Sequence, residues 1–75
     1  MEDIRNNELI KSLGDRIRIL RKKKSLTLEQ LAFASELELS QVHRIEKGKN
    51  NPSITTLKAI ANGLQITLSE LFEKI

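Results

Sequence analysis

One short stretch of the sequence carries polar side chains that suit contact with nucleobases. Between Leu39 and Lys47, Val42 and Ile45 are spaced as the inward face of a short helix, so the polar residues around them point outward. Arginine can pair with guanine through two hydrogen bonds, glutamine can pair with adenine, and serine can bond to several base edges. The outward residues, none of them acidic, are Ser40, Gln41, His43, Arg44 and Lys47. This surface suits the major groove of double-stranded DNA.

A second polar group follows this stretch and suits phosphates better than bases. Cationic and amide donors are the usual partners of the nucleic-acid backbone. They are Lys49, Asn50, Asn51 and Ser53. Seven basic residues and one acid also lie between Lys11 and Lys24. Such segregation can make one face positive, as a polyanion partner requires, although a solvated lysine-rich helix end explains it equally well.

Catalytic and metal-binding chemistry finds little support. Cysteine is absent, which excludes disulfides, thiolate metal sites and thiol catalysis. The single histidine, His43, has Lys47 rather than a second metal ligand four residues later. The glycines Gly14, Gly48 and Gly63 are too scattered to cradle a phosphate group. We therefore expect no enzyme, no cofactor and no metal ion.

Length and composition indicate a single small module. The 75 residues, 31% charged and 39% hydrophobic, suit one compact domain. We expect a short extension over residues 1–8 and one domain over residues 9–75, with no room for an effector-binding domain. The sequence contains no apolar run of about 20 residues and begins with the acidic Met1-Glu2-Asp3. A cytoplasmic protein without membrane contact is predicted.

The apolar spacing is helical along the whole chain. A first helix is predicted over residues 8–24, with Asn6 or Asn7 as its N-cap; its apolar stripe is too short for a coiled coil. Thr27 and Gln30 form a capping box for a second helix that ends near Ser35. The third helix covers residues 39–47 and stops at Gly48.

Two further helices complete the predicted set. Ser53 can cap a fourth helix that carries its apolar side chains on one face. Thr67 and Glu70 form a second capping box for a final helix. Its apolar residues are Leu68, Leu71, Phe72 and Ile75.

The second and third helices have the arrangement of a helix-turn-helix. Two short helices are joined by a turn of three or four residues, and Ala32 is small enough for their axes to approach closely. From about Leu13 to Phe72 the chain resembles the phage repressor/Cro-type (XRE-like) helix-turn-helix regulators. The matching segments, in order, are residues 16–21, 26–32, 42–48, 51–53, 57–61 and 68–72.

This resemblance implies a compact all-α, five-helix, lambda-repressor-like DNA-binding domain. Residues 39–47 would be the recognition helix of a sequence-specific regulator that acts as a dimer on a near-palindromic operator. Base contacts would fall on Leu39, Ser40, Gln41 and Arg44. Backbone contacts would fall at Thr27 and Leu28 and at Lys49, Asn50 and Asn51. From their residue types and positions, His43, Lys47 and Ser53 are also assigned to the DNA backbone. Arg21 and Glu46 match a partly buried ion pair with a structural role.

The sequence also departs from the family pattern. Leucine replaces a common glutamine at Leu28, so the phosphate contact made there by the amide is lost. Glu36 stands where glycine is common, so a non-glycine residue must adopt a positive φ or the turn must differ. Glu38 is a weak cap, and Leu39 either touches a thymine methyl group or packs inward.

Apolar side chains outside the core leave other functions open. Phe72 and Ile75 could form the interface of a homodimer, although Phe72 could equally pack into the core. Ile19 and Phe33 are expected to be exposed. The acidic Glu36-Leu37-Glu38 segment favours an alternative function, a protein-interaction module of antitoxin or scaffold type. Single-stranded RNA binding is disfavoured because the chain has only two aromatic residues.

Overall fold

A computed structural model describes the backbone of residues 4–75 and the side chains of residues 7–75. Over this range the chain forms helices and no strand. The helices are α1 (Ile4–Lys23), α2 (Leu28–Ser35), α3 (Leu39–Glu46), α4 (Ile54–Leu64) and α5 (Leu68–Leu71). The prediction of an all-α domain with five helices is therefore confirmed.

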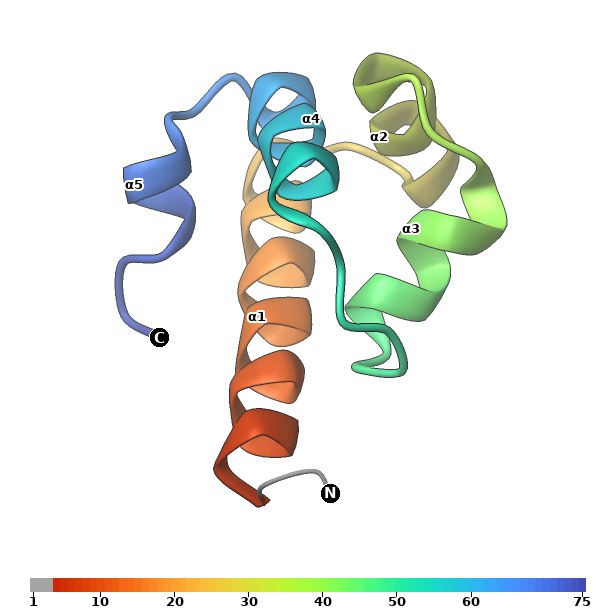
Figure 1. Cartoon of the computed structure of the whole chain (residues 1–75). Coiled ribbons are helices and arrows are strands. Elements are labelled where there is room, and N and C mark those ends of the chain that lie inside the picture. The colour runs from red at the N-terminus through yellow and green to blue at the C-terminus, as the bar shows by residue number, and fades with distance from the viewer. Residues whose placement is uncertain (1–3) are drawn as a thin grey trace.

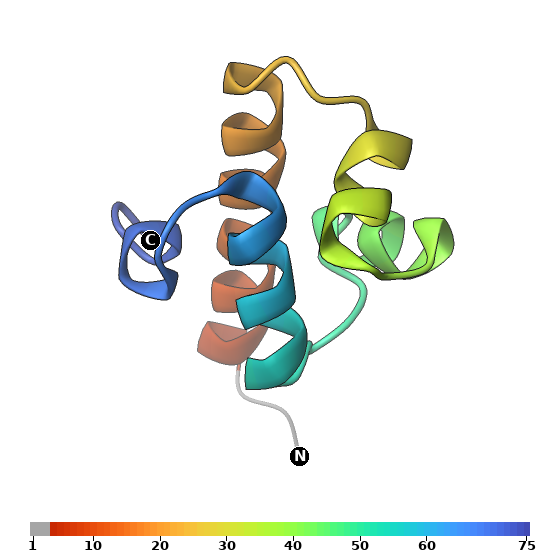
Figure 2. The same cartoon turned by 90° about the horizontal axis from the view of Figure 1, so that it is seen from above.

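The long helix α1 runs through the middle of the molecule, and the other helices pack around it (Figure 1). α2 packs against α3 and α4, and α3 also contacts α1. In both views α2 and α3 lie on one side of α1, whereas α5 lies on the other side (Figure 2). The helix-turn-helix and the C-terminal segment are thus on opposite sides of the domain.

One hydrophobic core joins all five helices. Its fully buried side chains include Ile17 of α1, Leu31 of α2, Ile45 of α3, Ile60 of α4 and Leu71 of α5. Burial of a side chain of this size contributes about 1.5–3 kcal/mol to the free energy of folding. Each helix is therefore held by at least one side chain that it shares with the common core.

Side-chain caps start three of the helices at the predicted residues. Thr27 and Gln30 bond reciprocally at 3.0 and 2.8 Å at the start of α2, and Thr67 and Glu70 do the same before α5. Ser53 accepts a hydrogen bond from the backbone N–H of Thr56 before α4. The hydrogen bond from the backbone N–H of Thr67, with a smaller contribution from the Thr67 side chain, lowers the pKa of the Glu70 carboxyl.

Two predicted helix boundaries are wrong. α1 already includes Ile4, the first residue with a described backbone, and does not start at residue 8, so Asn6 and Asn7 lie inside the helix. Asparagine costs a helix only about 0.7 kcal/mol, which neighbouring good helix formers can offset. α5 ends at Leu71, although the predicted final helix included Phe72 and Ile75. The N–H of Phe72 donates to the carbonyl of Ser69 as well as to that of Leu68, which tightens the last turn.

Non-glycine residues in the left-handed conformation end α2 and α4. Glu36 has a φ of 58°, and the next N–H, that of Leu37, donates to the carbonyl of Ala32 at 2.9 Å. Gln65 repeats this arrangement with a φ of 61° after α4. The glutamate therefore takes the conformation for which glycine is preferred, at a cost of about 1–2 kcal/mol.

Gly14 lies where the backbone of α1 comes close to the C-terminal end of α3. A Cβ atom at this position would lie 2.5 Å from the carbonyl oxygen of Ile45 and 2.7 Å from that of Glu46. Because both obstacles are backbone atoms, no side-chain rotation can relieve the clash. The backbone contact fixes the C-terminal end of α3 against α1.

We expect Gly14→Ala to destabilise the domain by about 1–3 kcal/mol, because α1 and α3 must separate to admit the methyl group. Alanine is the better helix former by about 1 kcal/mol, so propensity alone predicts the opposite sign. Urea unfolding measures the difference, with Ser12→Ala at an exposed site of the same helix as the control. A Gly14→Ala variant as stable as the parent would contradict the close approach.

Candidate nucleic-acid interface

The helix α3 is short and clearly two-sided. Val42, Ile45 and Glu46 are buried on its inner side. Glu38 occupies the N-cap position without a side-chain hydrogen bond, as expected of a weak cap. At the other end Gly48 adopts a φ of 72°, and the N–H of Lys49 bonds to the carbonyl of Arg44 at 3.0 Å. This left-handed glycine stops the helix where the sequence predicts.

The outer side of α3 presents most of the residues expected to contact DNA. Ser40, His43, Arg44 and Lys47 are exposed, and Gln41 is half-buried. Leu39 is 43% exposed and so does not pack into the core. Among the side chains of residues 7–75, no hydrogen bond or ion pair engages any of these polar groups. Within that range, nothing occupies their donors and acceptors, which leaves them to meet a ligand.

The segment after α3 brings further polar groups next to this face. Lys49 and Asn51 are exposed and Asn50 is half-buried. Ser53 is exposed, but its hydroxyl already bonds to Thr55, Thr56 and the N-terminus of α4. The Thr27 hydroxyl is similarly engaged in its capping box. Among the described side chains, none bonds to Lys49 or to the two asparagines, whereas the two hydroxyl residues also have a structural role.

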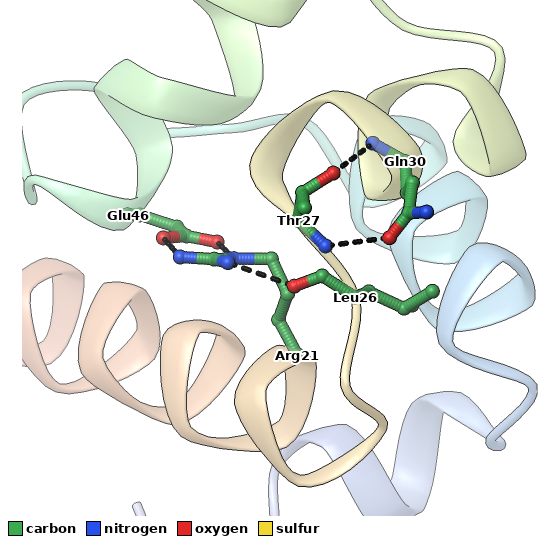
Figure 3. A network of polar contacts seen from close by, with 5 residues as sticks. All are labelled: Arg21, Leu26, Thr27, Gln30 and Glu46. Atoms are coloured by element: carbon green, nitrogen blue, oxygen red, sulfur yellow. Dashed lines mark hydrogen bonds and ion pairs between the residues drawn. The ribbon is translucent and has the colours of Figure 1, made fainter.

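An ion pair between Arg21 and Glu46 holds α3 against α1 (Figure 3). Nε of Arg21 donates to Oε2 of Glu46 at 2.7 Å, and a terminal nitrogen donates to Oε1 at 3.1 Å. The other terminal nitrogen donates to the carbonyl of Leu26, just before α2, at 2.9 Å. The two side chains are only 13% and 6% exposed. This bidentate geometry is the strong form of a charge-assisted hydrogen bond.

A second arginine on α1 holds α5, and no local sequence pattern predicts this contact. Arg16 donates to the backbone carbonyls of Glu70 at 2.9 Å and Leu71 at 3.4 Å. Phe72 and Ile75, which follow α5, are 38% and 40% exposed. Phe72 therefore keeps a substantial exposed surface at the end of α5, the helix that lies on the side of α1 opposite α3 (Figure 1).

Two other kinds of site receive no support within residues 4–75. No cluster of three histidine, cysteine or acidic side chains is arranged to hold a metal ion in this range. Nor does this range contain a helix of the length and apolarity needed to cross a bilayer. The exposed polar face of α3 is the main candidate for a functional surface.

Comparison with known proteins agrees with this geometry. Residues 17–71 match the helix-turn-helix family model. The chain belongs to the helix-turn-helix family. It is 41% identical over 71 residues to the control protein C.MunI from a Mycoplasma species, covering 92% of this chain and 95% of that protein. The crystal structure of the restriction-modification controller protein C.AhdI from Aeromonas hydrophila superposes with a TM-score of 0.81 at 42% identity, covering 87% of this chain and 97% of that one.

The helix-turn-helix relatives also include longer proteins. The immunity repressor of Bacillus phage phi105 is 40% identical over 60 residues, which cover 80% of this chain but 42% of the repressor. The family, its fold and these relatives make this chain a DNA-binding transcriptional regulator rather than an enzyme.

Arg21→Ala is expected to destabilise the domain by about 3–5 kcal/mol, because Glu46 would remain buried without a partner. The double variant Arg21→Met, Glu46→Leu should recover much of this loss, since apolar residues of similar volume often replace a buried pair without cost. Urea unfolding of Arg21→Met, Glu46→Leu and the double variant gives the coupling energy between the two side chains. Additive losses would show that Arg21 and Glu46 do not stabilise each other.

Proposed function

We propose that this helix-turn-helix protein binds a near-palindromic DNA site as a homodimer, with α3 of each copy in the major groove. The exposed outer side of α3 carries this proposal. It combines a guanidinium, an amide and a hydroxyl, all suited to base edges, with no acidic side chain on that side. The base contacts are assigned to Leu39, Ser40, Gln41 and Arg44. Lys47, Lys49 and the neighbouring polar residues are assigned to phosphates.

The proposed dimer uses the opposite side of the molecule. Phe72 and Ile75 expose apolar surface next to α5, and α5 lies across α1 from the helix-turn-helix (Figure 2). A two-fold contact there would leave both α3 helices uncovered. The half-sites would lie about 34 Å apart, which is one turn of DNA.

The likeness to controller proteins suggests the regulated genes. Both controller proteins match this chain along almost their whole length, whereas the phage repressor extends well beyond the match. We infer that this chain regulates restriction-modification genes. Selection of bound sites from a random duplex library tests this inference, because the selected sequence should lie upstream of such genes in the source genome.

Arg44 and Lys49 should affect DNA binding in different ways. Arg44→Ala should weaken binding to the selected site by about 1–3 kcal/mol and relax the preference at one base position. Lys49→Ala should weaken selected and random duplexes about equally and reduce the salt slope by about one unit. Fluorescence anisotropy at several salt concentrations measures both effects. If Arg44→Ala changes neither the affinity for the selected site nor that for random duplex, the assignment of Arg44 to a base is wrong.

Phe72→Ser should weaken self-association, because the interface would lose its aromatic side chain. We expect the dimer dissociation constant to rise at least about tenfold, which corresponds to about 1.4 kcal/mol. Sedimentation equilibrium measures the change. Phe33→Ser is the matched control, since Phe33 is 88% exposed on α2 and lies outside the proposed interface. Similar dissociation constants for the parent and Phe72→Ser would place the interface elsewhere.

The exposure of Phe33 supports a second candidate function. An aromatic side chain that is 88% exposed on α2, between the acidic Glu29 and Glu36, suits contact with another protein. The alternative is therefore a protein-interaction module of antitoxin or scaffold type. A gel shift at two salt concentrations, together with a pull-down that compares the parent with Phe33→Ser, separates this function from DNA binding.

A further inference from the structure

A basic pocket lies beside the proposed base-contacting face. Its volume is about 270 Å³, and it opens between α1, the first residue of α2 and one flank of α3. The residues that line it are Arg18, Arg21, Leu28, His43, Glu46 and Lys47. Arg18 is the member of this set with no function assigned so far.

The charges around the pocket do not cancel. Glu46 is the one acidic residue in the lining, and Arg21 holds it in a bidentate ion pair. Lys47 keeps its positive charge, Arg18 is paired only with the exposed carboxylate of Asp15, and the imidazole of His43 adds a hydrogen-bond donor. The pocket therefore attracts an anion.

Arg18 can exchange its present partner for such an anion. It pairs with Asp15 one helical turn earlier at 3.2 Å, and the two side chains are 44% and 59% exposed. An ion pair this open to solvent adds little to stability and is readily given up. A guanidinium also offers paired N–H groups that match the oxygen atoms of a phosphate.

The remaining wall of the pocket strengthens this preference. Leu28 is half-buried and packs against the core, so it shields one side of the pocket from water. It is also the first residue of α2, where the helix dipole places partial positive charge. Electrostatic attraction is stronger beside a wall of low polarity than in open solvent.

We propose that this pocket binds one phosphate of the DNA backbone through Arg18, His43 and Lys47. The inference rests on the proposed function and adds Arg18 as a DNA-contacting residue. His43 and Lys47 lie four residues apart on the flank of α3 that faces α1. A phosphate held there would lie at the edge of the groove that α3 enters, and would fix the position of α3 relative to the bases.

The test compares two variants that remove the same charge. Arg18→Gln should weaken binding to selected and random duplexes alike, by about threefold to tenfold, and should reduce the salt slope by about one unit. Lys58→Gln is the matched control, because Lys58 is exposed on α4 and does not line the pocket. Arg18→Lys keeps the positive charge, so the salt dependence of its DNA binding should stay close to that of the parent protein. Thermal melting verifies that all three variants fold.

A variant that removes the acidic partner of Arg18 should strengthen DNA binding. It tests whether Arg18 exchanges Asp15 for a DNA phosphate. Asp15→Asn frees Arg18 and should raise duplex affinity by about twofold to threefold, beyond the effect of Glu73→Gln, which removes an exposed acid outside the pocket lining. An equal gain in both variants would mean that only net charge matters, and would overturn the exchange.

A DNA phosphate and a free phosphate ion share the same chemistry, so a second measurement separates them. The His43 imidazole signals are followed by NMR during titration with inorganic phosphate, against chloride at equal ionic strength. If inorganic phosphate binds but Arg18→Gln and Lys58→Gln bind duplex identically, the pocket is a free-anion site and the proposal is overturned. If the parent protein binds no duplex at any salt concentration, both the proposed function and the phosphate-pocket proposal fail. If Arg44→Ala behaves as expected and Arg18→Gln matches Lys58→Gln, only the phosphate pocket is wrong.

Discussion

The guanidinium of Arg21 bonds to groups from separate parts of the chain, and the placement of the helix-turn-helix depends on these bonds. From α1 it reaches the carboxylate of Glu46 at the end of α3 and the carbonyl of Leu26 before α2. A buried pair of this kind is weak evidence for high stability, because removing both charges from water opposes folding. Its clearer effect is geometric. The start of α2 and the end of α3 are fixed against the same helix, and the two short helices keep one mutual orientation.

The close contact at Gly14 imposes the same constraint by a different interaction. The ion pair fixes α3 through directional hydrogen bonds, whereas Gly14 allows backbone to approach backbone. The two features lie on α1 seven residues apart, about two helical turns. α1 therefore acts as the rigid support of the domain. It carries α3 on one side and, through Arg16, α5 on the other.

Local patterns predicted the interior of this fold better than its ends. The capping boxes at Thr27 and Thr67 follow from residue types three positions apart, and Gly48 ends α3 because glycine tolerates a positive φ. The start of α1 was predicted too late, because asparagine is a favoured N-cap, yet its small cost inside a helix does not exclude it there. The contacts of Arg16 and the position of Arg18 beside His43 join residues far apart in the chain. They depend on how helices pack, which no local pattern specifies.

α3 has only eight residues, and its two sides have different roles. Its inner residues hold the domain together, whereas its outer side chains bond to no other group among residues 7–75. Exchanges on the outer side would therefore escape the selection that preserves folding. With α3 in the major groove as proposed, a few such exchanges after a gene duplication would give each copy its own set of target promoters while both copies remained equally well folded. A genome could thus hold several regulators of this type without cross-talk, as long as their outer side chains differ.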